Sequence, residues 1–377
     1  MKPLILESPA PRVVAWESTR ACNLVCRHCR ASAQETPEPD ELTTEEVKRL
    51  VDQIAAFSRP IFVITGGEPL MRPDVLDIAA YATERGLRVA FSPNGTLITP
   101  QIVQEMRQAG VRRVSVSLDG SCAERHDTIR GVPGAFDAAV RGMRYCLEGD
   151  LPFQVNTTVM RQNVDDLEAI HRLAVSLGAA AWHVFMLVPT GRGRVDDELT
   201  PQGYEEILNW VYEAALESPI PLRVTCGPQF MRLVLTRRKE GDTPPNLVGG
   251  QGKAGHPGMD HMSRGCLAGV GYCFISYRGE VYPCGYLPVL AGDVRQQDFR
   301  AIYQESPVFR SLRDLSRLQG KCGICPFVRH CGGCRARAYS LTGDYLAEEP
   351  YCVYEPPGHH ADAHRAQVEP DRSDEPR

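Results

Sequence analysis

Three cysteines lie close together near the N-terminus, in the segment CNLVCRHC. They are Cys22, Cys26 and Cys29. A structural zinc ion or an ordinary iron–sulfur cluster takes four protein ligands. Three neighbouring thiolates would therefore leave one iron of a [4Fe–4S] cluster open to an external molecule, which indicates catalysis. A zinc knuckle that takes a distant fourth ligand is the alternative.

A second group of cysteines lies in the C-terminal third of the chain. Eight of the fourteen cysteines belong to it: Cys266, Cys273, Cys284, Cys322, Cys325, Cys331, Cys334 and Cys352. Their pairwise short spacings are typical of metal ligands and predict a small domain organised by metal, with a pair of zinc sites as the alternative to iron–sulfur clusters. Cys122, Cys146 and Cys226 have no such spacing, and we expect them to be buried free thiols.

The composition of the chain limits which cellular compartment and which classes of partner are expected. The 377 residues are 43% hydrophobic and 24% charged, which is ordinary for a globular protein. The net charge of -5 provides no basic field for nucleic acid or an anionic membrane, so neither is an expected partner. The first residues lack the pattern of a secretory signal, and no apolar run is long enough to span a membrane. We therefore expect a cytoplasmic protein with reduced thiols.

Hydrophobic patterning places the first cysteines at the end of a strand. Short β-branched runs alternate with helical segments, which is typical of a parallel sheet covered by helices. The predicted strands are 12–17, 61–65, 88–92, 113–118, 153–159 and 181–187, and the helices between them are 44–57, 73–85, 100–109, 135–148 and 165–177. Six such steps predict an α/β fold, a partial (β/α)6 TIM-type barrel, with its active site at the carboxyl ends of the strands.

The remaining segments complete the predicted organisation. We expect an N-terminal extension over 1–11, the barrel with a following helix at 201–217 over 12–236, and a flexible linker over 237–263. The cysteine-rich domain spans 264–356, with one helical pattern at 299–318, and residues 357–377 read as a disordered tail. His359, His360 and His364 could bind metal, but a solvated tail is the favoured interpretation.

The cysteine triplet and four later strand ends resemble the radical S-adenosylmethionine (SAM) enzymes. Thr65-Gly66-Gly67-Glu68-Pro69 is similar to the family's GGEP loop, and polar residues follow the next strands in the family's order. The resemblance implies a [4Fe–4S] cluster on Cys22, Cys26 and Cys29 that binds SAM. It further implies SAM contacts from Gly66, Gly67, Glu68, Pro69, Asn94, Ser117, Arg130 and Asn156. His28 departs from the aromatic residue that commonly precedes the third cysteine.

The C-terminal cysteines resemble the SPASM extension, which carries auxiliary [4Fe–4S] clusters. The resemblance assigns Cys322, Cys325, Cys331 and Cys352 to one cluster. It assigns Cys266, Cys273, Cys284 and Cys334 to another, although the spacing from Cys331 to Cys334 is one residue shorter than the commonest pattern. One or two auxiliary clusters are therefore expected.

Longer stretches resemble the SPASM enzymes that tailor haem precursors, and most closely the SAM-dependent haem synthases. These stretches include QVNTT, HVFMLVPTGRG and GKCGICPFVRHCGGC. The resemblance implies oxidative decarboxylation of two propionates of iron-coproporphyrin III to the vinyls of protohaem (haem b), with a ferredoxin or flavodoxin as reductant. The alternatives are another haem-tailoring radical SAM enzyme of denitrifiers, a SPASM peptide maturase and a non-catalytic metal-binding scaffold.

A porphyrin carrying several carboxylates needs apolar walls and a few arginines for paired hydrogen bonds. Arg192 and Arg194 follow the sixth predicted strand, and Arg335 and Arg337 lie beside the auxiliary cysteines. Each is a candidate, with a solvated surface position as the alternative. His183 on the sixth strand is a candidate iron ligand or a satisfied core histidine.

Overall fold

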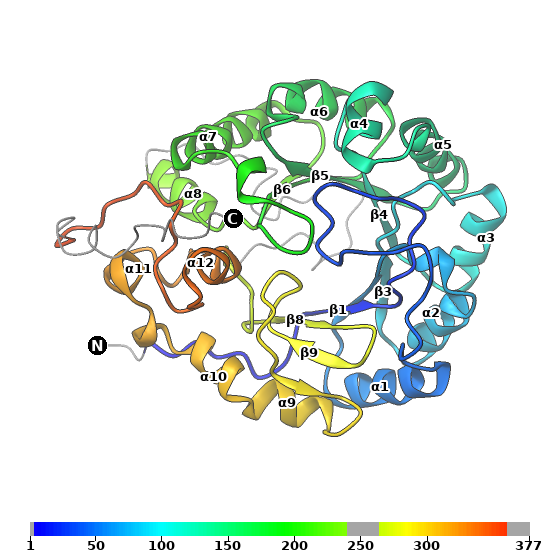
Figure 1. The fold of residues 1–377 in the computed structure, drawn as a ribbon, viewed down its shortest axis with the longest axis horizontal. Helices are drawn as coiled ribbons and strands as arrows, with labels where there is room; N and C mark the ends of the chain where they lie inside the picture. The colour runs from blue at the N-terminus through cyan, green and yellow to red at the C-terminus, as the bar shows by residue number, and fades with distance from the viewer. Residues whose placement is uncertain (1–3, 240–263, 360–377) are drawn as a thin grey trace, which may run out of the picture.

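A computed structural model describes residues 4–239 and 264–359. Its strands form one sheet in the order β10-β9-β8-β1-β2-β3-β4-β5-β6-β7. The strands from β8 to β7 in this order are all parallel to their neighbours, while β9 and β10 are antiparallel additions at one edge. Figure 1 shows the sheet curved into an open ring with helices outside it.

The six predicted strands are present within a residue or two of their predicted ends. They are β1 (Val13–Glu17), β2 (Ile61–Thr65), β3 (Arg88–Phe91), β4 (Arg113–Ser117), β5 (Phe153–Val159) and β6 (Trp182–Met186). The structure adds β7 (Leu222–Thr225) beside β6, and β8 (Tyr272–Ile275) beside β1. The barrel prediction is thus confirmed, and the barrel sheet contains two more parallel strands than the sequence predicted.

The cysteine-rich segment contributes the second added strand. β8 is followed by the short strands β9 (Glu280–Tyr282) and β10 (Gly292–Asp293). The turn between β8 and β9 includes Gly279, whose φ of 95° favours glycine. Part of the C-terminal domain is therefore continuous with the barrel sheet.

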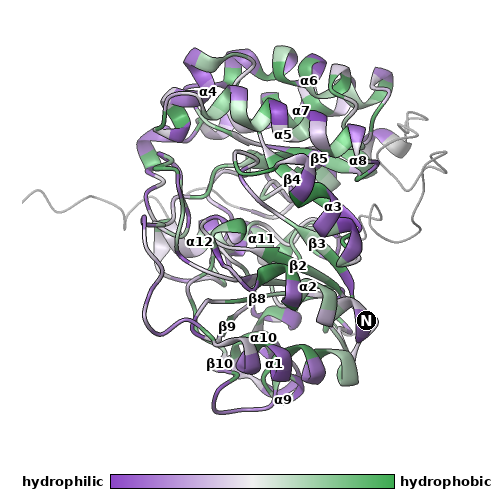
Figure 2. Cartoon of the chain, turned by 90° about the vertical axis from the view of Figure 1, so that its right-hand side faces the viewer, coloured by the Kyte–Doolittle hydropathy of each residue, from purple (hydrophilic) through white to green (hydrophobic). Residues whose placement is uncertain are grey.

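Helices cover the outer face of the strands. They are α1 (Thr44–Phe57), α2 (Val75–Glu84), α3 (Pro100–Gln108), α4 (Ala123–Arg130), α5 (Ala135–Glu148), α6 (Leu167–Ser176) and α7 (Pro201–Glu217). One continuous core of buried apolar side chains joins all of them except the polar α4 to the sheet. Figure 2 shows apolar strands inside and polar residues along the outer helices. This packing fixes the strand ends that carry the candidate site.

The remaining helices follow the last barrel strand or belong to the cysteine-rich segment. α8 (Phe230–Lys239) begins after β7, and α11 (Gly320–Ile324) and α12 (Arg335–Thr342) lie among the C-terminal cysteines in the sequence. The helix predicted over 299–318 is instead α9 (Phe299–Glu305) and α10 (Pro307–Arg313), because Pro307 cannot continue a helix.

Part of the predicted linker and tail, 240–263 and 360–377, lies outside the described residues. Within the described ranges, no helix has the combination of length and apolar character that crossing a membrane requires.

Candidate active site

A cavity of about 840 Å³ occupies the inside of the barrel. Alternate residues of the strands line it, because successive side chains of a strand point to opposite faces. β5 contributes Gln154, Asn156 and Thr158, and β6 contributes His183 and Phe185. Its volume lies in the range of small-molecule sites.

The cysteine triplet forms part of the cavity wall. Cys22, Cys26 and Cys29 all line it. Each sulfur has a donor nearby: the Leu24 N–H lies 3.4 Å from Cys22 Sγ, the Ala33 N–H lies 3.4 Å from Cys29 Sγ, and Arg130 Nη1 lies 3.7 Å from Cys26 Sγ. Such donors stabilise a thiolate.

Burial opposes ionisation of two of these thiols, Cys22 and Cys26. It raises the pKa of Cys22 to about 11, and it raises the pKa of Cys26, which Arg130 lowers in part. The N–H donors alone do not offset the cost of burying a thiolate. The positive charge of a metal cluster would offset it, so these thiols are suitable cluster ligands. The donor set therefore fits the [4Fe–4S] cluster expected from the sequence.

The loop after β6 holds the cysteine loop in place. Arg192 donates from Nε to the Cys26 carbonyl at 2.9 Å and from Nη1 to the Ala33 carbonyl at 2.8 Å. Gly191 has a φ of 64°, and a Cβ there would lie 2.4 Å from the Cys29 carbonyl oxygen. Arg192 is thus committed to the cysteine loop, while Arg194 is exposed. The structure does not place either one as a carboxylate ligand in the cavity wall.

His28 connects the cysteine loop to the end of β4. Its Nε2 lies 3.3 Å from Asp119 Oδ2, and Arg130 Nη2 lies 2.6 Å from the same oxygen. Burial lowers the pKa of His28 to about 4, so the ring is neutral at pH 7. His28 thus keeps the flat ring that is usual before the third cysteine, and it adds a polar contact to Asp119.

Most of the predicted SAM contacts share this cavity. Gly66, Gly67, Asn94, Ser117, Arg130 and Asn156 line it together with the cysteine triplet. Asn94 Nδ2 lies 3.9 Å from Cys22 Sγ. A Cβ on Gly67 would lie 2.4 Å from the Ala21 carbonyl oxygen, so this glycine lets the loop after β2 pack against the cysteine loop.

Glu68 and Pro69, the two other predicted SAM contacts, are not part of the cavity wall. The fully buried Glu68 carboxylate accepts the backbone N–H of Leu70 at 3.1 Å and of Asn94 at 2.6 Å. Pro69 begins a short 3-10 helix. These two residues order the loop after β2 and hold it to the loop after β3.

The cysteines of the C-terminal domain separate into two groups. Cys322, Cys325, Cys331 and Cys352 line one small pocket, which is the set that the resemblance assigned to one cluster. Cys266, Cys284 and Cys334 line the barrel cavity instead. Cys273, which we expected beside these three, is fully buried in the hydrophobic core between sheet and helices. The structure therefore does not bring Cys273 into the second group.

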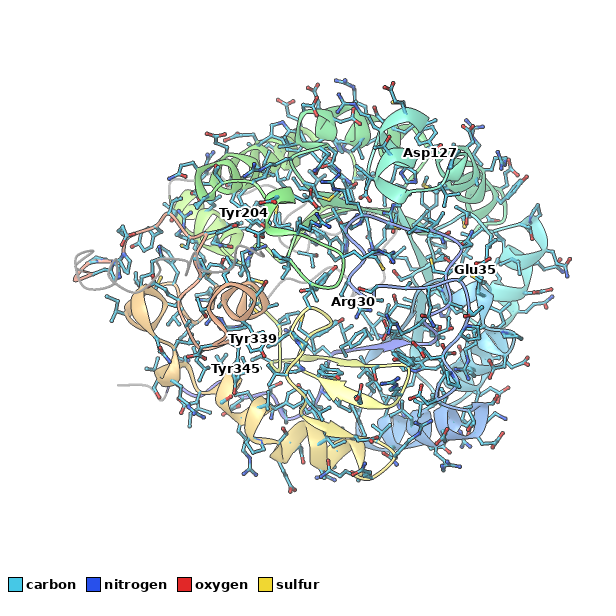
Figure 3. The ribbon with its side chains drawn as sticks, viewed as in Figure 1. Arg30, Glu35, Asp127, Tyr204, Tyr339 and Tyr345 are labelled. Carbon is cyan, nitrogen blue, oxygen red and sulfur yellow. The ribbon has the colours of Figure 1, made fainter. Side chains whose placement is uncertain are left out.

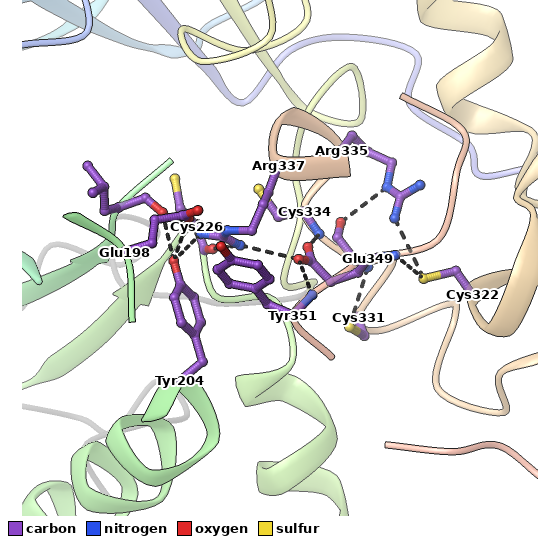
Figure 4. A network of polar contacts seen from close by, with 12 residues as sticks. Glu198, Tyr204, Cys226, Cys322, Cys331, Cys334, Arg335, Arg337, Glu349 and Tyr351 are labelled. Carbon is purple, nitrogen blue, oxygen red and sulfur yellow. Dashed lines mark hydrogen bonds and ion pairs between the residues drawn. The ribbon is translucent and has the colours of Figure 1, made fainter. Parts of the chain in front are cut away.

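Arg335 and Arg337 are buried and bind protein groups. Arg335 Nη2 lies 3.6 Å from Cys322 Sγ, and its Nη1 donates to the Ala347 carbonyl at 2.6 Å. Arg337 pairs with Glu198 at 3.0 Å and with Glu349 at 3.5 Å (Figure 4). Both arginines are thus structural, which corrects the expectation that they bind a substrate carboxylate at the rim.

Seven arginines that sequence reasoning missed line the cavity with the predicted Arg130. They are Arg12, Arg30, Arg59, Arg88, Arg113, Arg223 and Arg264. Within the described residues, no Asp, Glu or Lys side chain contributes to this wall. Arg30 extends over the centre of the ring (Figure 3), where its guanidinium lies 4.3 Å from the Phe274 ring centroid and 2.9 Å from Glu17. Arg88, Arg113 and Arg223 could have been found from the inward-facing positions of their strands.

His183 lines the same wall, and its Nδ1 lies 3.1 Å from Gln154 Nε2. This contact ties His183 on β6 to the neighbouring strand β5, and the role of His183 as an iron ligand stays a prediction.

In the part of the chain that the structure describes, no three His, Cys, Asp or Glu side chains come close enough to hold one metal ion.

Comparisons with known proteins identify the domains and the family of the chain. Residues 16–174 match the model of the radical SAM superfamily, and residues 266–334 match SPASM, an iron-sulfur cluster-binding domain. The chain is 50% identical to the AdoMet-dependent heme synthase of Methanosarcina barkeri, covering 94% of this chain and 99% of the relative. It is 47% identical to the same enzyme of Nitratidesulfovibrio vulgaris, covering 93% and 94%.

The fold is shared with solved structures. Streptococcus suis SuiB bound to S-adenosylmethionine superposes with a TM-score of 0.70 at 15% identity, covering 92% of this chain and 78% of that one. These domains imply [4Fe–4S] clusters and SAM as cofactors. The chain is therefore a radical SAM enzyme with a SPASM domain, and it belongs to the family of the AdoMet-dependent heme synthases.

Proposed function

We propose that the protein converts iron-coproporphyrin III to protohaem (haem b) by oxidative decarboxylation of two propionates to vinyls. One observation carries this proposal: the cavity that holds the cysteine triplet also holds eight arginines and, among the described residues, no carboxylate or lysine. Such a wall suits a large, flat polyanion. The high identity to AdoMet-dependent heme synthases supports the same substrate.

The cavity provides both kinds of contact that the porphyrin requires. Ala15, Val63, Ala90 and Phe185 present apolar surface from four different strands. An arginine that faces the cavity can form paired hydrogen bonds with a carboxylate. An ion pair that is buried inside the barrel is strengthened, because water that would compete for the carboxylate is excluded.

The cysteine triplet would hold the SAM cluster. A reduced cluster with SAM supplies hydrogen-atom abstraction from an unactivated carbon, which no side chain of the protein can perform. The chain itself positions the reactants: Arg130 and Asn94 contact the cysteine sulfurs, and Ser117 and Asn156 line the cavity from adjacent strands. His28 stays neutral beside Asp119 and thus adds no positive charge to the cluster loop.

Conversion of a propionate to a vinyl group removes a hydrogen atom, an electron and CO2. Loss of one hydrogen atom from the β-carbon, one electron and one CO2 leaves the carbon–carbon double bond, so an electron acceptor is required. We assign this role to an auxiliary cluster on Cys322, Cys325, Cys331 and Cys352, which line a shared pocket in the SPASM domain. We further propose two auxiliary clusters, a ferredoxin or flavodoxin as the initial reductant, and a cytoplasmic location that keeps the thiols reduced.

The test is anaerobic incubation of the protein with dithionite, SAM and iron-coproporphyrin III, followed by mass analysis. We expect 5′-deoxyadenosine and a porphyrin that has lost two formic-acid equivalents. Loss of propionates without vinyl formation would indicate the related haem-tailoring chemistry. SAM cleavage with an unchanged porphyrin would favour a peptide substrate, and no 5′-deoxyadenosine would indicate a non-catalytic scaffold.

A further inference from the structure

Cys226 lies directly after β7, far in sequence from the C-terminal cysteines. It lines the barrel cavity together with Cys266, Cys284 and Cys334. Cys226, Cys284 and Cys334 also belong to one packed cluster of side chains, and Figure 4 shows Cys226 and Cys334 on neighbouring segments. Four thiols from four separate segments therefore meet on one wall.

Local geometry brings Cys226 to this position. Its φ of 60° is in the left-handed region, which is uncommon for a residue with a Cβ and is typical of functional sites. A Cβ on Gly265 would lie 2.6 Å from Pro228 Cα, so the segment after Cys226 packs directly on the segment before Cys266. Arg337 Nη1 donates to the Cys226 carbonyl at 3.1 Å and so ties it to helix α12, which begins next to Cys334.

The opposite face of β8 holds Cys273. Tyr272 and Phe274 line the cavity, so Cys273 between them points to the other face of the sheet. There it is fully buried within the main hydrophobic core, and Arg313 is the charged neighbour that lowers its raised pKa. A ligand to a group in the cavity cannot come from that face.

We propose that Cys226, not Cys273, is the fourth ligand of the second auxiliary [4Fe–4S] cluster, with Cys266, Cys284 and Cys334. This cluster then faces the substrate cavity and joins strand β7 of the barrel to the SPASM domain. The inference rests on the positions of the thiols and is independent of the porphyrin chemistry proposed above.

The experiment counts iron and sulfide in the full-length protein, reconstituted and kept without oxygen. With three clusters, the parent holds about twelve irons. Cys226→Ala is expected to hold about eight, because one cluster loses a ligand. Cys273→Ala and the matched control Cys146→Ala, which removes another fully buried core thiol, are expected to keep about twelve. Far-UV circular dichroism confirms that each variant is folded.

Three iron counts would overturn the proposal: about twelve irons kept by folded Cys226→Ala, loss of about four irons from folded Cys273→Ala, or a parent that holds only about eight. If Cys226→Ala does not fold, the same iron analysis is made on Cys226→Ser, together with electron paramagnetic resonance spectroscopy. An oxygen ligand is expected to retain the iron while changing the electron paramagnetic resonance signal of one reduced cluster. An unchanged spectrum in Cys226→Ser also contradicts the assignment. No substrate is needed, so these outcomes do not depend on the proposed function.

Discussion

Single residues of the cysteine loop show what sequence position can and cannot reveal. The spacing of Cys22, Cys26 and Cys29 was enough to predict that the three thiols meet at one site, and the structure places them in one cavity wall. Arg192 was correctly placed near the site but given the wrong partner. A sequence motif locates a residue on a loop, whereas the direction of a long side chain depends on tertiary packing, so its role could not be predicted.

Replacing Arg192 tests the part that this residue plays in positioning the cysteine loop. Arg192→Ala removes donors to the Cys26 and Ala33 carbonyls. We expect the rate of 5′-deoxyadenosine formation to fall about tenfold, equivalent to about 1.4 kcal/mol, while a full complement of iron remains. Steady-state assay with iron analysis measures both. The exposed Arg194→Ala serves as the control, and equal rates in the two variants would refute this role.

At the scale of elements, the prediction was best where a pattern repeats. β2, β5, α1, α5 and α7 have the residue ranges expected from alternation, period and capping. β7 and β8 were missed, because neither lies in the regular alternation of strand and helix that identified even the four-residue β3, and β8 lies among cysteines that dominated its interpretation. α4 was missed because its sequence, AERHDTIR, is polar on most of its surface. Short or polar elements form through tertiary contacts that local pattern does not encode.

The capping box of α1 also joins the barrel to the C-terminal domain. Glu46 accepts from the Thr43 N–H at 2.8 Å and from Arg295 Nε at 2.9 Å, and these contacts lower the pKa of Glu46 to about 2. Glu46→Gln is expected to lower the free energy of unfolding by about 1 kcal/mol at pH 7. Urea unfolding of both proteins measures this difference, with the more exposed Glu45→Gln as a control that should change it by less than about 0.5 kcal/mol.

The sign of the pH dependence follows from the lowered pKa. The contribution of Glu46 is fully present above its unfolded pKa of roughly 4.3 and is lost as the pH falls from there to about 2. The difference between parent and Glu46→Gln should therefore be constant from pH 7 to pH 5 and shrink below pH 4. A difference that grows on acidification contradicts this account.

At the scale of the molecule, one buried network joins barrel and SPASM domain. Arg337 of α12 contacts Glu198 and the hydroxyl of Tyr204 in the barrel, and Glu349 near the C-terminus (Figure 4). Arg337→Ala leaves two buried carboxylates without their counter-charge, and we expect it to lower the free energy of unfolding by about 3–5 kcal/mol. Anaerobic urea unfolding measures this loss. The control is Arg317→Ala, which changes an exposed arginine. Equally small losses of unfolding free energy in the two variants would show that the network does not stabilise the fold.

The SPASM domain also has a predicted role in electron transfer. Cys322→Ala combined with Cys325→Ala removes two of the four thiols of one pocket, which is separate from the cavity that holds the cysteine triplet. We expect SAM cleavage to continue while vinyl formation is lost, because the electron released with CO2 then has no acceptor. Product analysis by mass spectrometry distinguishes the two activities. An undiminished yield of vinyl groups would show that this cluster is not the acceptor.

The most direct measurement follows hydrogen from substrate to cofactor within the cavity. Iron-coproporphyrin III deuterated at the β-carbons of its propionates is incubated anaerobically with the protein, SAM and dithionite, and 5′-deoxyadenosine is analysed by mass. Our account predicts that deuterium enters 5′-deoxyadenosine and that two such transfers accompany each protohaem formed. Protohaem formed together with unlabelled 5′-deoxyadenosine, or label transferred without any vinyl product, would contradict the account.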